Sequence, residues 1–193
     1  MTKKLLLAAF EPELAQARQL PLHNWQVALT GIGGITASIS TARLVSEMRP
    51  KKVLFVGSCG AYTDSIQIGD CIATSEVLIN SISEIHHRAY RPQREIIRWQ
   101  ATWELPLPKH VVLATPAITS SIEDATLLSQ LATVEHLELA GVFAACQQAD
   151  VPVAAALVVA NRVGPNAHLE WKANHATASQ RLICVLNDLG VFG

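Results

Sequence analysis

Two uninterrupted apolar segments constrain the fold of this chain more than any other feature. Residues 53–56 read Val-Leu-Phe-Val, and residues 153–160 read Val-Ala-Ala-Ala-Leu-Val-Val-Ala. A strand with one face in solvent alternates apolar and polar side chains, whereas a strand in a covered parallel sheet is apolar throughout. Both segments are therefore predicted to be strands buried on both faces.

The remaining segments alternate between strand and helix signals. Apolar runs typical of strands occupy residues 4–10, 25–30, 70–77 and 111–115, and helical spacing occupies residues 35–48, 123–131, 138–149 and 173–188. Strands separated by helices predict an α/β fold, in which a central mixed, mostly parallel sheet lies between two helical layers. The 193 residues contain no visible linker or internal repeat, so we expect a single three-layer αβα domain over residues 1–193.

Composition excludes several function classes. The net charge of −1 at pH 7 lacks the basic excess that a nucleic-acid-binding protein usually shows. No apolar run reaches the ~18 residues of a membrane span, and the short apolar run 5–10 is followed at once by Glu11 and Glu13, which favours a first strand over a signal peptide. Four widely spaced cysteines without a CxxC pair indicate free thiols and no metal site. We therefore expect a cytoplasmic protein with no membrane or nucleic-acid partner.

Two glycine-rich segments follow predicted strands, where open α/β sheets bind their ligands. Gly31-Ile-Gly-Gly34 completes neither a dinucleotide fingerprint nor a phosphate-binding P-loop, so it is either a tight turn or a ligand contact. Gly57-Ser-Cys-Gly-Ala61 is predicted to end the strand 53–56. Its small residues, its backbone N–H groups and the Ser58 hydroxyl suit a pocket floor, although a plain strand-to-loop turn fits equally well.

Three polar residues lie in or next to apolar segments, where packing in a hydrophobic core alone would favour apolar side chains. Glu13 follows the first strand, where it either acts in a site or caps a helix. Glu138 precedes a very apolar helix, and a buried carboxylate needs a partner, either a helix N-terminus or ligand hydroxyls. Asn161 ends the apolar run 153–160, where it either begins a turn or faces a ligand.

These motifs, in this order, resemble the nucleoside phosphorylase and nucleosidase superfamily, which includes methylthioadenosine/S-adenosylhomocysteine nucleosidases. The resemblance covers nearly the whole chain and a nucleoside phosphorylase-like fold is expected from it. The matching segments are residues 5–14, Gly31-Ile-Gly33, Gly57-Ser-Cys-Gly-Ala61, Ile68-Gly-Asp70, Leu137-Glu-Leu-Ala140, Val151-Pro-Val153 and Val159-Ala-Asn161.

The last of these motifs suggests a subfamily. Adenine-specific members end this strand in Ile-Ser-Asp, whereas here Val159-Ala-Asn-Arg-Val-Gly-Pro165 is followed by Trp171. This is similar to futalosine hydrolases, which release hypoxanthine from futalosine in a route to menaquinone. An Asn can donate its NH₂ to O6 of a 6-oxopurine and accept a hydrogen bond from a protonated N7. We therefore predict release of a 6-oxopurine rather than adenine.

Hydrolysis is predicted over phosphorolysis. In the hexameric phosphorylases that this chain resembles, the residue three before the serine of the glycine turn is a phosphate-binding Arg, and here it is Phe55. Loss of that cation removes an anchor for phosphate, unless Arg43 or an arginine between residues 81 and 98 replaces it. A nucleosidase or phosphorylase for methylthioadenosine, inosine or a hopanoid-linked nucleoside, and a catalytically silent purine-binding homologue, remain the alternatives.

The resemblance implies a role for each site residue. Glu13 activates the water and Asn161 assists departure of the base, and both are expected to be catalytic. No metal or cofactor is implied. A homo-oligomer is expected, in which a neighbouring subunit closes the pocket. The irregular residues 81–108 are a candidate lid, subunit contact or plain surface loop. Substrate-binding roles are implied for Ser58 (water or ribose ring oxygen), Cys59, Gly60, Ile118 (base), Leu137 (ribose) and Glu138 (ribose hydroxyls).

Overall fold

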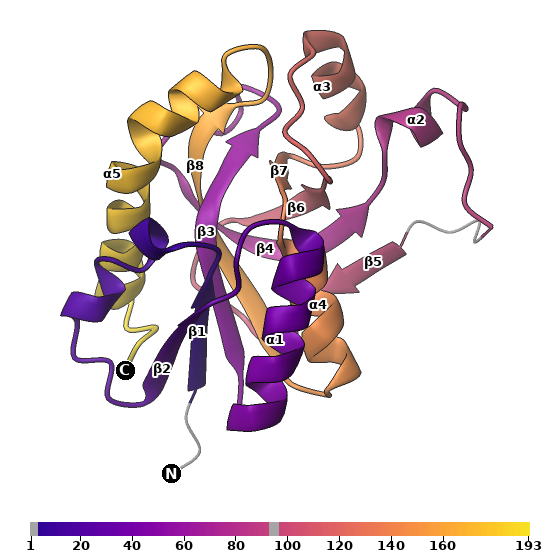
Figure 1. Ribbon diagram of the computed structural model, residues 1–193. Coiled ribbons are helices and arrows are strands. Elements are labelled where there is room, and N and C mark those ends of the chain that lie inside the picture. Colours follow the sequence, from indigo (N-terminus) through magenta and orange to yellow (C-terminus); the bar gives the residue numbers. More distant parts are fainter. Residues whose placement is uncertain (1–3, 93–96) are drawn as a thin grey trace.

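A computed structural model describes residues 4–92 and 97–193. Its centre is an 8-stranded mixed sheet in the order β2-β1-β3-β7-β6-β4-β5, with β8 paired to both β3 and β4 (Figure 1). Most neighbouring strands are parallel, while β3 with β7, β4 with β5 and β4 with β8 are antiparallel. The strands are β1 (Lys4–Ala8), β2 (Trp25–Leu29), β3 (Val53–Ala61), β4 (Cys71–Ile79), β5 (Ile97–Gln100), β6 (Lys109–Ala114), β7 (Val134–His136) and β8 (Val153–Arg162).

Helices cover both faces of the sheet (Figure 1). The pair α1 (Gly34–Met48) and α4 (Leu139–Gln148) lies on one face, and α5 (Ala167–Asp188) lies on the other. A Cβ on Gly141 of α4 would lie 2.1 Å from the carbonyl oxygen of Gly34, so glycine allows the two helix backbones to touch. Shorter helices are α2 (Ile82–Ile85), α3 (Ile122–Leu128), η1 (Glu11–Glu13) and η2 (Ala17–Gln19).

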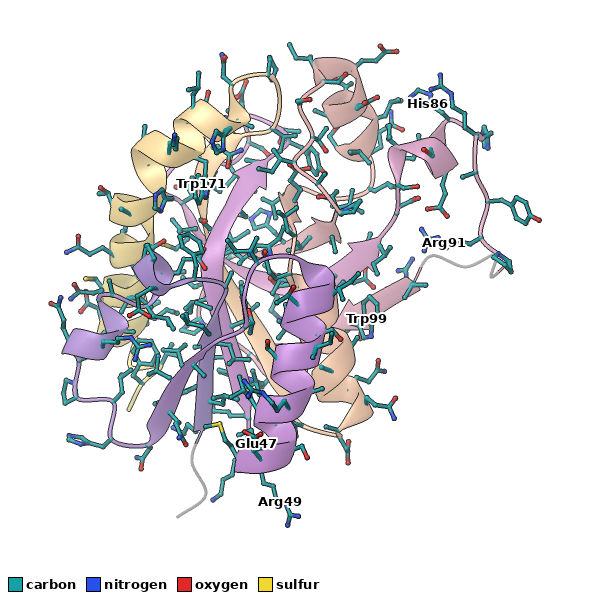
Figure 2. All side chains as sticks on the ribbon, in the orientation of Figure 1. Glu47, Arg49, His86, Arg91, Trp99 and Trp171 are labelled. Atoms are coloured by element: carbon teal, nitrogen blue, oxygen red, sulfur yellow. The ribbon has the colours of Figure 1, made fainter. Side chains whose placement is uncertain are left out.

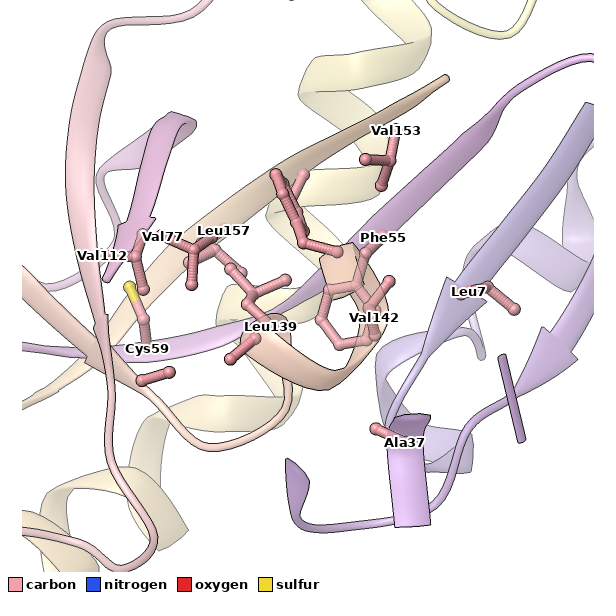
Figure 3. Close-up of a cluster of buried hydrophobic side chains, with 14 of the residues drawn as sticks. Leu7, Ala37, Phe55, Cys59, Val77, Val112, Leu139, Val142, Val153 and Leu157 are labelled. Carbon is pink, nitrogen blue, oxygen red and sulfur yellow. The ribbon is translucent and has the colours of Figure 1, made fainter. Parts of the chain in front are cut away.

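Alternate residues of the central strands pack into two different hydrophobic clusters. Leu5, Leu7 and Phe55 belong to the cluster with α1 and α4, of which Figure 3 shows Leu7, Phe55, Leu139 and Val142. Leu6 and Leu54 belong to the cluster with α5. Each cluster buries one face of the same strands, which is why the sequence of these strands is apolar without alternation. The predicted three-layer α/β fold with a mixed, mostly parallel sheet is confirmed.

The expected stop at Gly57 is wrong, because β3 continues through the glycine-rich segment to Ala61. It stays paired with β8 over this length, with one register shift between Cys59 and Gly60. The glycines serve close approach instead of a turn. A Cβ at Gly57 would lie 3.0 Å from Nε2 of His136, and one at Gly60 would lie 2.9 Å from Nδ2 of Asn161.

Several other boundaries differ from the sequence expectation. Asn161 lies inside β8 and does not begin a turn, and α5 begins at Ala167, earlier than residue 173. The irregular segment contains α2 and the edge strand β5, while residues 93–96 lie outside the described part of the chain. None of the helices in the described residues is both long enough and apolar enough to cross a membrane.

Candidate active site

One cavity of about 230 Å³ lies where β1, β3 and β8 end and gathers every site residue predicted from the sequence. Because these three strands run parallel, the segments that follow them meet at one edge of the sheet. The predicted residues that line this cavity are Glu13, Ser58, Cys59, Gly60, Ile118, Leu137, Glu138 and Asn161.

Glu13 is a buried carboxylate at the end of η1, only 3% exposed. Its Oε1 accepts hydrogen bonds from the backbone N–H (2.8 Å) and the hydroxyl (3.0 Å) of Ser58, and its Oε2 accepts one from the N–H of Ala9 (3.1 Å). Burial raises the pKa of Glu13 to about 7, although these three donors oppose the shift. A carboxyl group of this kind can exchange a proton near neutral pH.

Trp171 extends the network around Glu13. It projects from α5 toward β3 (Figure 2), and its indole Nε1 donates a hydrogen bond to Oγ of Ser58 at 3.1 Å. Because an indole N–H can only donate, the single Ser58 proton is directed to Glu13. The Trp171 ring is stacked on His175 at a centroid distance of 4.3 Å and on His168 at 5.9 Å, so its orientation is held from both faces.

Glu138 faces the same cavity from the N-cap position, directly before α4. Its Oε1 accepts a hydrogen bond from the backbone N–H of Gly33 at 2.7 Å. Gly33 has a φ of 89°, so the segment Gly31-Ile-Gly-Gly34 is a tight turn that also presents an N–H group to the site. Since one N–H satisfies only part of the capacity of a carboxylate, Glu138 retains lone pairs for further donors, such as sugar hydroxyls.

His136 lies beneath Glu138 as a neutral imidazole. Its Nδ1 accepts a hydrogen bond from the backbone N–H of Glu138 at 3.1 Å, which places the ring proton on Nε2. Burial lowers the pKa of His136. The 3.2 Å approach of Nδ1 to Oε2 of Glu138 is therefore a contact with a neutral ring and not an ion pair.

Asn161 lies at the end of β8 and is 5% exposed. One N–H of its Nδ2 donates a hydrogen bond to the carbonyl oxygen of Arg162 at 3.0 Å, which fixes the plane of the amide. The side chain therefore has a defined orientation at the cavity wall and keeps a second N–H and an amide oxygen as a donor–acceptor pair.

The hydrophobic part of the wall includes Ile118 and Leu137. Ile118 is 47% exposed at the edge of the cavity. Cys59 also lines it, and burial raises the pKa of this thiol well above its usual range. The thiol therefore stays protonated and is not a nucleophile, while the expected substrate-binding role of Cys59 stays a prediction.

No Lys or Arg side chain lines this cavity among the described residues. Phe55, at the position where a phosphate-binding Arg was considered, is fully buried and packs edge-on against His136 at 5.3 Å. Arg91 forms an ion pair with Glu84 and Arg98 with Glu76, while Arg94 lies outside the described residues. The described residues also contain no group of three His, Cys, Asp or Glu side chains that could hold a metal ion.

The sequence interpretation missed three residues of this site. Glu135 and His136 line the cavity from β7, and Trp171 was noted only as part of a motif. The signal for the first two was available, because Glu135 and His136 stand directly between the apolar residues Val134 and Leu137. Trp171 left no such signal, since its contact with Ser58 spans 113 residues of sequence.

The fold and the position of the cavity define an α/β protein whose candidate site lies at the carboxyl edge of its sheet, where open α/β sheets bind their ligands. The family model of the phosphorylase superfamily matches residues 22–135 of this chain. The chain belongs to the phosphorylase superfamily, which confirms the resemblance seen in its motifs. Glu13, Glu138 and Asn161 lie outside the matched residues.

Curated relatives are nucleosidases that match only part of the chain. The 5′-methylthioadenosine/S-adenosylhomocysteine nucleosidase of Shewanella pealeana is 28% identical over 154 residues, covering 65% of this chain and 63% of the relative. That of Shewanella loihica is 43% identical over 51 residues, covering 26% and 22%. The chain thus spans less than two thirds of the length of these relatives.

Solved structures show the same fold over almost the whole chain. The 5′-methylthioadenosine/S-adenosylhomocysteine nucleosidase of Helicobacter pylori superposes with a TM-score of 0.85 at 18% identity, covering 99% of this chain and 98% of the other. The futalosine hydrolase of Helicobacter pylori superposes with a TM-score of 0.84 at 19% identity, with the same coverage.

Proposed function

We propose that this chain hydrolyses the N-glycosidic bond of a purine nucleoside, and that the nucleoside is futalosine, which would yield hypoxanthine and dehypoxanthine futalosine for menaquinone biosynthesis. The observation that carries the proposal is the placement of Glu13, Glu138 and Asn161 on the wall of one cavity. Glu13 has the raised pKa of a general base, and the described cavity wall contains no Lys or Arg side chain that would hold phosphate.

The proposed reaction begins with a water molecule beside Glu13. Glu13 takes a proton from the water as its oxygen bonds to the anomeric carbon, and the bond from that carbon to N9 of the purine breaks. The electron pair of the broken bond moves to the purine, and N7 takes a proton from a solvent water, so that hypoxanthine leaves neutral. The hydroxide formed from that water is neutralised by the proton that Glu13 returns to solvent. The charge of Glu138 stabilises the positive charge that develops on the sugar, and Ser58 holds Glu13 through two hydrogen bonds.

Asn161 supports a 6-oxopurine as the leaving group. Its free N–H matches O6, and its amide oxygen matches the proton on N7. The curated relatives favour the main alternative, because their names specify methylthioadenosine and S-adenosylhomocysteine. A phosphorylase acting on inosine or a hopanoid-linked nucleoside would fit the fold, but a cavity wall without Lys or Arg does not favour phosphate binding. A silent purine-binding protein would also fit the fold, but it would not need a carboxyl group with the raised pKa of Glu13.

Incubation of the purified protein with futalosine, methylthioadenosine, inosine and adenosine, each with and without phosphate, tests this proposal. We expect phosphate-independent release of hypoxanthine from futalosine. Release of adenine only, or an absolute need for phosphate, would reject futalosine hydrolysis. Purine binding in calorimetry without turnover of any nucleoside would identify a silent homologue.

Trp171→Phe is expected to shift the pH dependence of this activity. Without the indole N–H, the Ser58 hydroxyl is free to rotate away from Glu13, so a donor that lowers the pKa of Glu13 is weakened. Because the base must be ionised, kcat/KM should fall by about 3- to 10-fold at pH 6.5 and change little at pH 8.5.

Trp103→Phe is the matched control, since Trp103 donates its indole N–H to the carbonyl oxygen of Val53 at 3.2 Å and does not line the cavity. Its pH profile should match that of the wild type. An equal loss of activity at both pH values in Trp171→Phe would show that Trp171 acts through packing alone.

We further propose that the chain forms a homo-oligomer through an apolar groove between α1 and the edge of the sheet. The groove has a volume of about 710 Å³ and shares Leu137 with the cavity. Its wall includes Ile35 and Ile39, which are 81% and 67% exposed on α1. A second copy that covers this groove would also border the cavity, in line with the expected closure of the pocket by a neighbour.

Ile35→Asp is expected to convert an oligomer to a monomer in light scattering coupled to size exclusion, because it places a charge in the apolar contact. Ile122→Asp on α3, where the side chain is 67% exposed, is the matched control and should leave the mass unchanged. A monomeric wild type would reject the interface.

The cytoplasmic location stays a prediction and is supported by the four cysteines, all of which are free.

A further inference from the structure

The position of Asn161 in the cavity wall depends on a β-bulge in β8. Strands β3 and β8 pair residue by residue up to Cys59 and Val159, and the next pair is Gly60 with Asn161. Ala160 is therefore one extra residue on the β8 side. Without the bulge, Ala160 would lie opposite Gly60. Since a bulge re-aims the side chains that follow it, this one brings Asn161 beside Gly60 in the cavity wall.

Two side chains of α5 hold the backbone on either side of Asn161. Nδ2 of Asn174 donates a hydrogen bond to the carbonyl oxygen of Ala160 at 3.1 Å, and Oε2 of Glu170 accepts one from the backbone N–H of Arg162 at 2.7 Å. These two groups belong to the peptide units that flank the Cα of Asn161. Because peptide units are planar, holding both of them fixes the backbone dihedral angles of Asn161.

The backbone of Arg162 extends this control to the amide of Asn161. The Asn161 side chain donates to the carbonyl oxygen of Arg162, while Glu170 binds the N–H of the same residue. A shift of Arg162 would therefore turn the Asn161 amide with it. The Arg162 guanidinium also pairs with Asp64 at 3.3 Å, which holds this residue from the loop that follows β3.

Glu170 and Asn174 belong to one face of α5, because they are four residues apart in a helix. This helix runs beside β8 (Figure 1). Both side chains are half-buried, and neither contributes to the cavity wall that the described residues form. They can therefore influence a bound substrate only through the residues they hold. A displacement of about 1 Å in a group that contacts substrate can cost ~10²-fold in rate.

We propose that Glu170 and Asn174 are positioning residues, which hold the bulge of β8 and thereby direct the amide of Asn161 into the cavity. This inference rests on the proposed function, in which Asn161 assists departure of the base. A merely structural role would make the two hydrogen bonds contribute to stability alone, so the test must separate an effect on Asn161 from an effect on folding.

A double-mutant cycle provides this separation, with kcat/KM for futalosine measured in single-turnover assays. Asn174→Ala is expected to lower kcat/KM by about 10- to 100-fold in the wild type. In the Asn161→Ala background it should lower kcat/KM by less than about 2-fold, because no amide remains to be positioned. Asn187→Ala, an exposed position on the same helix, is the matched control and should change nothing. An equal loss in both backgrounds would overturn the inference.

Glu170 offers a second pair of variants if Asn174→Ala does not fold. Glu170→Gln keeps an oxygen that can accept the N–H of Arg162, whereas Glu170→Ala removes it. Glu170→Gln should therefore stay within about 3-fold of wild-type activity, and Glu170→Ala should lose about as much as Asn174→Ala. Equal losses in the two Glu170 variants would contradict the positioning role.

Hydrogen exchange of the Arg162 backbone amide tests the hold on the bulge without any substrate. Asn174→Ala should speed this exchange by at least about 10-fold, and Asn187→Ala should leave it unchanged. Unchanged exchange in Asn174→Ala would overturn the inference even if futalosine is hydrolysed. Faster exchange in Asn174→Ala, together with a wild type that does not hydrolyse futalosine, would overturn the proposed function and leave the hold on the bulge intact.

Discussion

Glu13→Gln is expected to reduce turnover by at least about 10³-fold, because the amide cannot take a proton from the attacking water. Single-turnover assays with futalosine at pH 8, where wild-type Glu13 is ionised, provide the measurement. Binding of hypoxanthine should be largely retained, since Glu13 faces the water and not the base. A Glu13→Gln variant with full activity would show that another group is the general base.

The same variant is expected to change how stability depends on pH. The pKa of Glu13 is raised from 4.5 to about 7 in the folded protein, so the folded state holds a proton that the unfolded state has lost between these values. The wild type therefore loses stability as the pH rises from about 5 to 7. Glu13→Gln lacks this titration, so thermal melts should show its stability rising relative to the wild type over this interval.

Asn161→Asp is expected to lower kcat/KM for futalosine by about 10²- to 10³-fold and to shift the preference toward adenine nucleosides. A carboxylate offers no N–H to O6, and its lone pairs repel that oxygen. Near neutral pH it would also lie close to Glu135, because both residues flank Gly60, and the two like charges would oppose each other. The measurement is the ratio of kcat/KM for futalosine and methylthioadenosine in both proteins.

Asn161→Ala separates recognition from simple disruption of the cavity. It removes the amide without adding a charge, so it should weaken futalosine hydrolysis and gain nothing with methylthioadenosine. An Asn161→Asp variant that keeps the wild-type preference would show that the base is recognised elsewhere in the cavity.

Sequence pattern predicted the class of fold because burial on both faces leaves a local mark. Leu5, Leu6 and Leu7 are consecutive yet belong to two clusters on opposite sides of the sheet, and the same holds for residues 53–56. The pattern failed at Gly57 and Gly60. In the sequence, a glycine that forms a turn looks the same as a glycine in a strand that other side chains approach closely. Only the positions of His136 and Asn161 in the folded chain show that Gly57 and Gly60 are of the second kind.

The candidate site divides in the same way. Glu13, Glu138 and Asn161 could be recognised from the sequence, because each is a polar side chain next to a strongly apolar segment. Their partners could not be recognised. Gly33 and Glu138, which form a hydrogen bond, are 105 residues apart in the sequence, and Trp171 and Ser58 are 113 residues apart. Neither hydrogen bond can be predicted from the local sequence around its two residues.

Sequence alone therefore determined the layers of this protein, the edge of the sheet at which the cavity lies and the polar residues that gather there. Tertiary structure decided which atoms those residues bond: the three donors around the Glu13 carboxylate, the acceptor role of Nδ1 of His136 and the close approach of Asn161 to Gly60. The physical reason is that periodicity records the burial of a segment, whereas a hydrogen bond between distant segments depends on strand register and helix packing, which the whole chain sets together.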